Sequence, residues 1–467
     1  MSKSNFLSSF LGQVANQPLA IAVEFAKDKA TYEELYNQSL KVCKYLRLHA
    51  DGEVFIGIET KQSIQNYANI IGVWMFGAAY VPLNSACPQK MVDQMVVDLG
   101  IKTILSNEVV RESNLEASND GLNSTVSSEI AYVIHTSGST GNPKSALVTH
   151  GNLNALTSHY LNKDQYEFSA NDRFLQSYDL SFDVSVFCFA IPLMLGATVV
   201  VPQDKGVRFM TIISSIIKDN ITVCSNVPSV AKYAMPRLNE ISMSSLRYCF
   251  FSGEALHGSW AKAWMKSASG AQVYNCYGPT ETTVVCTTEL LNELDSAYFE
   301  SNVPLPLGQP FENMKLVIDD GEICFKGTQV FKGYFGQTEI DHLNYYQTGD
   351  LAKFDVNGKL IFQGRKDEQV QINGFRVELA AIDALVFKEF GCQSKTIVVT
   401  HLKKSDQLVT VVESESDLMM PGVISYLGTY LPEYSVPTEI LIKQKLPLNS
   451  NGKLDVKGLI NWVQGEI

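Results

Sequence analysis

Along the N-terminal part of the chain, short apolar runs alternate with segments whose apolar residues repeat with the period of a helix. Thr31 and Glu34 form a capping box ahead of a helix that should end near Leu48. The segments that follow are a strand, a helix, a second strand and a second helix, at 54–59, 63–76, 78–83 and 88–99. This alternation predicts a mostly parallel sheet with helices on its faces.

The pattern changes after residue 345. Two stretches, 351–362 and 369–379, place Asn-Gly between alternating apolar residues, which is the strongest short signal for a β-hairpin. The charged segment between them has no apolar anchors, so we expect a domain boundary at about residue 367. The sequence thus predicts an α/β fold with a large N-terminal domain of sheets flanked by helices over 1–366 and a small α+β C-terminal domain over 367–467.

A glycine-rich segment reads TSGSTGNPKSALVT and begins at Thr136. It comes within one letter of the P-loop pattern G-x-x-x-x-G-K-[ST], but Pro143 stands where that pattern requires glycine. Proline has no N–H to offer a phosphate, and a P-loop opens directly into a helix. Here the flanking segments, 131–136 and 145–149, have the composition of strands, and helical signals return only after His150. We therefore expect a different phosphate loop, which joins strand to strand.

Composition narrows the possible classes of function. The 467 residues carry a formal net charge of −12, and 45% of them are hydrophobic, as in an ordinary acidic globular protein. Nucleic acid is not an expected partner, because binding it requires clustered basic surface. A membrane is not expected either, since the apolar run 186–201 contains Pro192 and Gly196 and is too short to span one. The apolar spacing of residues 6 to 14 indicates a helix rather than a signal peptide.

The cysteines carry information about the compartment. There are nine, without a C-x-x-C pair, and most lie in apolar runs with the composition of strands, such as VFCF around Cys188 and RYCFF around Cys249. Buried, reduced thiols are expected, which indicates a reducing cytosol. We expect a cytoplasmic protein that is a monomer or a weak dimer.

Six motifs occur in order between Tyr132 and Asp455: YVIHTSGSTGNPK, YNCYGPTETT, GEICFKGTQVFKGYF, YQTGDL, GRKDEQVQINGFRVEL and LPLNSNGKLD. Together they closely resemble the adenylate-forming superfamily of acyl-CoA synthetases, luciferases, amino-acid-activating adenylation domains and D-alanine:carrier protein ligases. The resemblance implies a large N-terminal domain and a small, mobile C-terminal domain. It also implies two half-reactions: a carboxylate attacks the α-phosphate of ATP to give an acyl-adenylate and pyrophosphate, and a thiol then takes the acyl group.

Attack of an anion on ATP requires positive charge and hydrogen-bond donors where charge develops. The resemblance implies that Ser139, Thr140 and Lys144 serve the β- and γ-phosphates together with the backbone N–H groups of their loop. Glu281 resembles the Mg²⁺ ligand and Thr280 an α-phosphate contact. The residues that the resemblance places around ATP are Thr136, Ser137, Gly138, Ser139, Thr140, Gly141, Lys144, Gly253, Asn275, Cys276, Tyr277, Gly278, Thr280, Asp350, Phe362, Arg365 and Lys453.

Four of these residues resemble the part of the site that binds the nucleoside. Tyr277 resembles the ring that stacks on adenine, and Asn275 the partner of its amino group. Asp350 would hold the ribose hydroxyls, since a carboxylate accepts both, with Arg365 alongside. Taken alone, Tyr-Gly-Pro is more often a simple turn and an exposed aspartate is usually solvated, so these assignments depend on the resemblance.

Lys453 resembles the catalytic lysine that binds both the attacking carboxylate and the α-phosphate region, and we expect Lys453, Thr140 and Glu281 to carry the chemistry. Asn451 and Gly452 precede the lysine and predict a turn, which would place the ammonium at a loop tip. Asp367 resembles the hinge about which the small domain rotates between the two half-reactions. Without the motif, Lys453 would be read as an ordinary surface lysine.

The substrate class depends on Asp183, in SYDLSFDVSVF. In the amino-acid-activating branch this aspartate pairs with the α-ammonium of the substrate, and the alternative is a structural aspartate at a helix terminus. A carboxylate with such apolar neighbours needs a cation to stay ionised at low cost. By resemblance the side-chain pocket consists of Val184, Phe187, Ser225, Phe250, Ser252, Cys276, Val284 and Val285. None is charged, so alanine, serine, proline or valine would fit, in either configuration, and tryptophan, lysine and glutamate would not.

The chain departs from the family pattern at Ser145, Gln347, Gln371 and Asn373. The core catalytic positions are retained, so these departures bear more on thiol transfer than on adenylation. We expect activation of a small-to-medium neutral amino acid with ATP and Mg²⁺, and transfer to the phosphopantetheine arm of a carrier protein in trans, because the chain has no Gly-Gly-x-Ser site of its own. The alternatives are an AMP-forming acid:CoA ligase and a non-catalytic nucleotide-binding paralogue.

Overall fold

The computed structural model describes residues 5–107, 127–136, 138, 143–203, 206–301, 303–341, 343–399, 406–414, 420–448 and 454–466. By internal contacts the chain divides into two compact units. The first comprises Met1–Asn84, Val96–His135 and Ser145–Lys366, and the second comprises Ser85–Met95, Thr136–Lys144 and Asp367–Ile467. The assignment of a core domain and a mobile lid to this chain stays a prediction.

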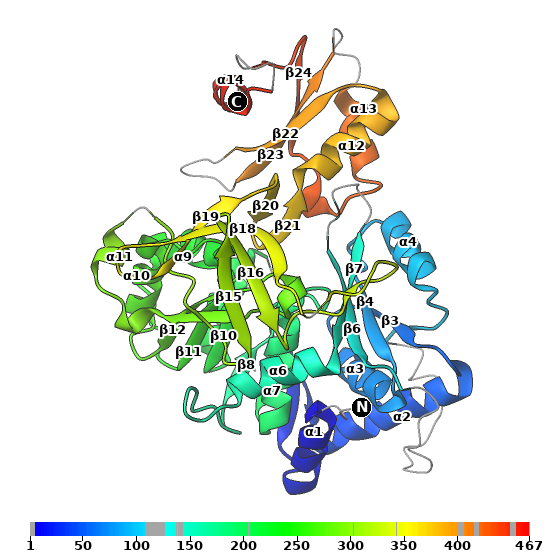
Figure 1. Ribbon diagram of the computed structural model, residues 1–467. Helices are drawn as coiled ribbons and strands as arrows, with labels where there is room; N and C mark the ends of the chain where they lie inside the picture. The colour runs from blue at the N-terminus through cyan, green and yellow to red at the C-terminus, as the bar shows by residue number, and fades with distance from the viewer. Residues whose placement is uncertain are drawn as a thin grey trace. The chain divides into compact units, whose positions relative to one another are not determined.

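The largest sheet of the first unit has nine strands, in the order β14-β13-β12-β11-β10-β8-β9-β1-β2 (Figure 1). The six strands from β12 to β1 run parallel, and antiparallel partners close both edges. Every residue of β10 and β11 is buried, as expected for a parallel sheet covered on both faces. The strands are β1 (Ile21–Phe25), β2 (Asp28–Thr31), β8 (Arg173–Leu175), β9 (Thr198–Val201), β10 (Val223–Asn226), β11 (Tyr248–Phe251), β12 (Gln272–Tyr277), β13 (Thr287–Leu290) and β14 (Gln309–Pro310).

A second sheet has six strands, in the order β17-β7-β6-β4-β3-β5. Strands β6, β4, β3 and β5 run parallel, whereas the edge strand β17 pairs with β7 antiparallel. The strands are β3 (Phe55–Glu59), β4 (Ala79–Leu83), β5 (Ile104–Leu105), β6 (Ile130–Thr136), β7 (Lys144–Thr149) and β17 (Gly333–Tyr334). The prediction of mostly parallel sheets is confirmed for both large sheets.

Helices cover these sheets. Two of them, α3 (Ile64–Phe76) and α7 (Val184–Leu195), are apolar around most of their circumference and almost fully buried. This is typical of helices that pack on more than one side. The other helices of this part of the chain are α1 (Asn5–Asn16), α2 (Tyr32–His49), α4 (Gln89–Leu99), α6 (His150–Tyr160), α8 (Arg208–Lys218), α9 (Pro228–Leu238), α10 (Gly258–Ser267) and α11 (Ala297–Glu300), with short 3₁₀ helices η1 (Thr280–Thr282) and η2 (Leu291–Glu293).

One hydrophobic core joins the two large sheets. It includes Tyr80 and Tyr132 from the six-stranded sheet and Phe174 and Phe250 from the nine-stranded sheet, all nearly inaccessible to solvent. Their rings pack mostly edge to face or tilted, the favoured arrangements for aromatic pairs. The core fixes the carboxyl ends of the parallel strands, where the residues singled out by sequence gather.

A smaller antiparallel sheet completes the first unit. Its strand order is β15-β16-β18-β19. The strands are β15 (Met314–Asp319), β16 (Glu322–Gly327), β18 (Tyr346–Phe354) and β19 (Leu360–Arg365). The predicted hairpin at 351–362 is confirmed, because β18 and β19 pair antiparallel. Its turn is longer than an Asn-Gly turn: the Asp355 carboxylate accepts hydrogen bonds from the backbone N–H groups of Asn357 and Lys359.

In its described residues, the segment Asp367–Ile467 of the second unit contains two small sheets and three α-helices. Strands β20 (Gln369–Ile372) and β21 (Phe375–Glu378) form the second predicted hairpin, in which Asn373 and Gly374 both have positive φ, as a two-residue Asn-Gly turn requires. The other sheet has the order β22-β23-β24. The remaining elements are α12 (Leu379–Phe390), β22 (Ser394–Val399), β23 (Gln407–Glu413), α13 (Met420–Leu427), the 3₁₀ helix η4 (Glu433–Ser435), β24 (Glu439–Lys443) and α14 (Val456–Glu466).

Local predictions were mostly accurate. Thr31 caps α2 with both hydrogen bonds of a capping box, and the helix ends at His49. None of the nine cysteines forms a disulfide, and seven of them are buried. One interpretation was wrong: the run around Cys188 is part of helix α7 rather than a strand, because Gly196 ends the helix in a left-handed conformation and only then does β9 begin.

Candidate active site

The glycine-rich segment joins two neighbouring strands of one sheet. Strand β6 ends at Thr136 and β7 begins at Lys144, and a helix begins only at His150. The prediction of a strand-to-strand loop is therefore confirmed. Gly138 and Pro143 are described, whereas the predicted phosphate-binding residues Ser137, Ser139, Thr140 and Gly141 lie outside the described residues.

The residue before this loop does not supply positive charge. Burial lowers the pKa of His135 to about 4, with Asp98 opposing the shift. The imidazole is therefore neutral near pH 7. Any cation for a bound phosphate must come from elsewhere, which is consistent with the roles predicted for Lys144 and for Lys453, the latter outside the described residues.

Three residues predicted at the nucleoside lie in contact with one another. Asp350, on β18, accepts a hydrogen bond from Arg365 Nη1 on β19 at 2.7 Å and one from the Tyr277 hydroxyl at 2.6 Å. Burial and the neighbouring Asp350 carboxylate raise the pKa of Tyr277 well above its usual value, so its hydroxyl stays protonated and donates. A carboxylate offers about four acceptor positions. Arg365 and Tyr277 thus hold the Asp350 carboxylate in one orientation.

Asn275 lies within β12, and Gly278 is the first residue after that strand. The Asn275 side-chain Nδ2 donates to the backbone oxygens of Pro306 at 2.7 Å and Leu305 at 3.3 Å. The remaining polar atom of its carboxamide is an oxygen, the acceptor that an adenine amino group requires. A Cβ atom at Gly278 would lie 2.6 Å from Cα of Val285, so only glycine fits there.

Glu281 lies in η1, with none of its surface exposed. Its carboxylate accepts a hydrogen bond from the Tyr334 hydroxyl, and its backbone oxygen accepts one from Phe331 N–H at 2.9 Å. A fully buried carboxylate is costly without a cation. In the described parts of the chain, no group of three or more His, Cys, Asp or Glu side chains could hold a metal by itself. Glu281 therefore fits a magnesium ion that is shared with nucleotide phosphates.

The turn after Glu281 is strained. Thr283 has φ of 60° and Val284 has φ of 71°, a region that β-branched residues rarely adopt. Val285 N–H donates to the backbone oxygen of Thr283 at 2.9 Å, which makes Val284 the centre of a three-residue turn with the positive φ of the rare, strained γ-turn. The strain lies in the turn that follows the predicted magnesium ligand Glu281, and Val284, a predicted pocket residue, is at the centre of that turn.

The predicted pocket residues come from four elements that the fold brings together. Asp183 and Val184 lie at the start of α7, and Phe187 follows one turn later. Ser225 lies near the carboxyl end of β10. The others lie at or just beyond the carboxyl ends of β11 and β12 and in the strained turn: Phe250, Ser252, Cys276, Val284 and Val285. Ser225 pairs with Phe250 across the parallel strands. All except Val184 are buried.

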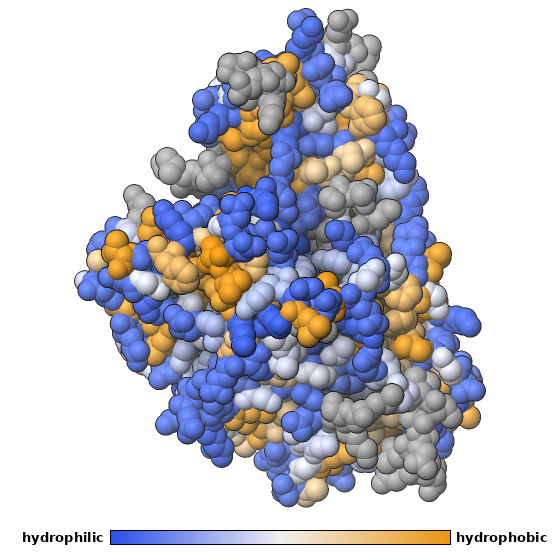
Figure 2. Space-filling model, viewed as in Figure 1, coloured by the Kyte–Doolittle hydropathy of each residue, from blue (hydrophilic) through white to orange (hydrophobic). Residues whose placement is uncertain are grey.

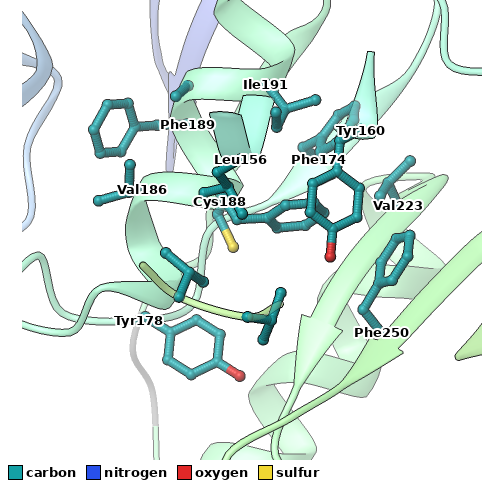
Figure 3. Packing of buried hydrophobic residues seen from close by; sticks show 14 of the residues in the cluster. Leu156, Tyr160, Phe174, Tyr178, Val186, Cys188, Phe189, Ile191, Val223 and Phe250 are labelled. Atoms are coloured by element: carbon teal, nitrogen blue, oxygen red, sulfur yellow. The ribbon is translucent and has the colours of Figure 1, made fainter. Parts of the chain in front are cut away.

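An aromatic cluster fills the interior beside these residues. The rings of Phe187, Phe250 and Tyr160 contact one another edge to face, with centroid distances of 4.7 to 5.6 Å. Figure 3 shows the rings of Tyr160 of α6 and Phe250 of β11 near each other, in the same hydrophobic cluster as Cys188 of α7. Sequence reasoning missed Tyr160, which lies at the end of a helix outside every quoted motif.

Asp183 is 9% exposed and precedes the first residue of α7. It occupies the N-cap position of α7, although its side chain makes no capping hydrogen bond to the helix. Burial and then the Asp183 charge raise the pKa values of Tyr80 and Tyr132, so both hydroxyls stay protonated close to this carboxylate. Its role as an ammonium anchor stays a prediction.

The remaining predicted residues lie around these groups or apart from them. Gly253 follows β11 with φ of 88°, Thr280 opens η1, and Phe362 is a half-buried residue of β19. Asp367 is the first residue of the second unit's main segment and accepts a hydrogen bond from Gln369 N–H at 3.2 Å. Tyr334 and the buried Gln329, which contacts the strained turn, were missed, although both lie in the motif GEICFKGTQVFKGYF.

The family model of the AMP-binding enzymes matches residues 10–335. The chain belongs to the AMP-binding enzyme family. This confirms the resemblance to adenylate-forming enzymes. A curated relative of this AMP-binding enzyme, zwittermicin A synthase ZmaJ of Bacillus cereus, is 29% identical over 96% of this chain and 93% of its own length. Gramicidin S synthase 2 of Brevibacillus brevis is 27% identical, but the chain spans only 11% of its length.

Solved structures share the fold of this AMP-binding enzyme. The Vibrio cholerae adenylation domain AlmE, in complex with glycyl-adenosine-5′-phosphate, has a TM-score of 0.84 at 23% identity and covers 100% of this chain and 98% of its own. Holo-PA1221, which contains adenylation and PCP domains, has a TM-score of 0.85 at 20% identity and covers 98% of this chain and 84% of its own. The predicted architecture is thereby confirmed as that of an adenylation domain.

Figure 2 shows a largely hydrophilic face on which hydrophobic residues form separate groups. None of the helices that the structure describes has both the length and the apolar character needed to cross a membrane.

Proposed function

We propose that this AMP-binding enzyme activates a small neutral amino acid with ATP and transfers it to the phosphopantetheine thiol of a carrier protein. In the first step a carboxylate oxygen of the amino acid bonds to the α-phosphorus while the bond to the β-phosphate breaks, which gives aminoacyl-AMP and pyrophosphate. In the second step the thiolate attacks the acyl carbon and AMP leaves. The observation that carries the proposal is Asp183, a buried carboxylate among pocket residues that are otherwise uncharged.

The aromatic cluster supports a small side chain. Phe187 and Phe250 are 3% and 2% exposed, and each packs against Tyr160 as well as against the other. Protein interiors are close-packed, so a bulky substrate side chain could enter only if these rings moved. Ser225 and Ser252 are compatible with a small hydroxyl group. AlmE, which binds glycyl-adenylate, is a fold neighbour in keeping with a small substrate.

The nucleoside would be held by residues of the first unit. The Asp350 carboxylate accepts the ribose hydroxyls, with Arg365 and Tyr277 fixing its orientation. Asn275 accepts from the adenine amino group, and the Tyr277 ring stacks on the base. Glu281 would hold Mg²⁺, which would supply positive charge for the nucleotide phosphates. Lys453 adds the charge that the neutral His135 cannot provide.

Pyrophosphate exchange tests the first step. We expect exchange with one or a few small neutral amino acids, in one configuration, when all amino acids are offered as both enantiomers. Exchange driven only by an acid without an amino group would contradict the proposal.

Asp183→Ala tests the anchor itself. Breaking a buried ion pair costs about 3–5 kcal/mol, so kcat/KM for the amino acid should fall by roughly two to four powers of ten. Val184→Ala, at the adjacent uncharged residue, is the control and should leave the ammonium requirement intact. If the wild type activates the des-amino acid as well as the amino acid, Asp183 is not an ammonium anchor.

Carrier loading tests the second step. ATP-dependent aminoacylation of a holo carrier protein from the same genome, absent with the apo form, is the expected result. The fold neighbour holo-PA1221 is described as an NRPS protein that contains adenylation and PCP domains, which supports a carrier as acceptor. Efficient turnover with CoA and with no such carrier would instead favour an acid:CoA ligase.

A further inference from the structure

Gln329 clamps the strained turn that follows Glu281. The Gln329 side chain is completely buried, and its Nε2 donates to the backbone oxygens of Val285 at 2.8 Å, Thr282 at 3.3 Å and Thr283 at 3.4 Å. Three acceptors around one end of the carboxamide identify that end as the NH₂ group. A single side chain therefore bonds to the turn on both sides of Val284.

The clamp holds backbone conformations that would otherwise relax. Thr283 and Val284 have φ values of 60° and 71°, and residues with a branched Cβ adopt this region only when the surrounding structure imposes it. The Thr283 hydroxyl adds a further bond, donating to the backbone oxygen of Gln329 at 2.6 Å. The two segments are thus tied by side-chain bonds in both directions.

The segment that carries Gln329 also fixes Glu281. Phe331 N–H donates to the backbone oxygen of Glu281 at 2.9 Å, and the Tyr334 hydroxyl donates to its carboxylate. The segment is anchored in turn by Asn152 of α6, whose Nδ2 donates to the backbone oxygens of Thr328 at 2.7 Å and Val330 at 2.9 Å. Helix α6 thus holds the backbone of this segment on both sides of Gln329.

We infer that Gln329 is a positioning residue for adenylation, which sets the Glu281 carboxylate and the pocket walls Val284 and Val285 in one geometry. The inference rests on the proposed function, in which Glu281 serves magnesium and the two valines line the pocket. Loss of the Gln329 amide should let the γ-turn relax, and it should impair magnesium use and amino-acid recognition together. Nucleoside recognition by Asp350 lies outside the clamp and should change little.

Gln329→Met removes the amide but keeps the shape of the side chain. The expected result in pyrophosphate exchange is that the free Mg²⁺ concentration for half-maximal rate and the KM for the amino acid each rise about tenfold, the equivalent of about 1.4 kcal/mol. Tyr32→Phe is the matched control, because the buried Tyr32 hydroxyl also donates to two backbone oxygens, those of Pro192 and Ala197, away from this turn. It should lower the unfolding midpoint and leave both constants unchanged.

Gln329→Glu adds a readout that a purely structural role would not change. A protonated carboxyl group can donate one hydrogen bond to the carbonyl oxygens, whereas a carboxylate repels them. Burial favours the protonated form. Activity of this variant relative to the wild type should therefore rise as the pH falls from about 9 to about 6. The ratio for Gln329→Met should stay flat.

The inference is overturned if Gln329→Met lowers the unfolding midpoint, as Tyr32→Phe does, while the Mg²⁺ concentration for half-maximal rate and the KM for the amino acid both stay within about twofold of the wild type. A wild type that exchanges pyrophosphate with no amino acid would count against the proposed function alone. In that case calorimetric titration of ATP, with and without Mg²⁺, supplies the magnesium dependence for the same variants. An unchanged magnesium dependence of ATP binding in Gln329→Met would then reject the clamp.

Discussion

Asp350→Asn replaces the carboxylate proposed to hold the ribose by a neutral side chain of the same shape. In the structure this carboxylate is 10% exposed and bonded to Arg365 Nη1 at 2.7 Å and to the Tyr277 hydroxyl at 2.6 Å. Hydrogen bonds to charged groups contribute about 1.5–3 kcal/mol, against about 1 kcal/mol for neutral ones. The ATP dissociation constant should therefore rise roughly 10- to 100-fold.

The cleanest assay compares ATP with 2′-deoxy-ATP and 3′-deoxy-ATP by calorimetric titration. In the wild type each missing hydroxyl should weaken binding, because it leaves an acceptor of Asp350 unused. In Asp350→Asn the same omissions should cost less, and the difference measures the coupling between the residue and the hydroxyl. Tyr277→Phe keeps the ring for the base but loses the bond to Asp350. In this variant the loss of affinity for each deoxy nucleotide should lie between the losses in the wild type and in Asp350→Asn.

A matched control separates this effect from general destabilisation. Glu24 is a carboxylate with 13% exposure, bonded to Arg173 at 2.6 Å and Lys29 at 2.8 Å on the far strands β1, β2 and β8. Glu24→Gln should lower the unfolding midpoint without changing ATP binding. If Asp350→Asn discriminates against both deoxy nucleotides by the same factors as the wild type, the ribose assignment is refuted.

Three further predictions follow from other parts of the chain. Lys453→Ala should slow adenylate formation by roughly 10²- to 10³-fold with ATP binding nearly intact, and unchanged pyrophosphate exchange would reject the assignment. Asp367→Pro fixes φ and should slow thioester formation far more than adenylation in rapid-quench assays, whereas equal losses would argue against a hinge. Burial raises the pKa of Asp383 in α12 from its usual 3.8 to about 6, so this group's contribution to stability is present below pH 3.8 and is lost as pH rises through 6. Asp383→Asn should accordingly stabilise the protein by at most about 3 kcal/mol at pH 8 and little at pH 4, as thermal unfolding would measure.

Much of the fold could be predicted because local signals and tertiary structure agree. The capping box at Thr31, the left-handed Asn373 and Gly374 of the second hairpin and the strands around the glycine-rich loop each have a local physical cause. The error at Cys188 has a physical cause too. A fully buried helix lacks a polar face, so its sequence has no helical periodicity to distinguish it from a buried strand.

The site was only partly predictable. Tyr277, Asp350 and Arg365 were found through motifs, and the structure brings them into contact. Gln329 could not be found from local pattern, because it acts across the fold on a turn whose strained residue is a valine, a residue type that predicts extended structure. Positive φ at such a residue is imposed by tertiary contacts, which no window of sequence reports.

The loop from Tyr277 to Cys286 closes on itself, and this has a practical consequence for redesign. Cys286 N–H donates to the backbone oxygen of Tyr277 at 2.9 Å, and Gly278 leaves no room for a side chain against Val285. An engineer who changes Val284 or Val285 to admit a new substrate would also disturb the turn that follows Glu281, the predicted magnesium ligand. Phe187 and Phe250 belong to a separate helix and strand, so libraries aimed at new amino acids should begin there.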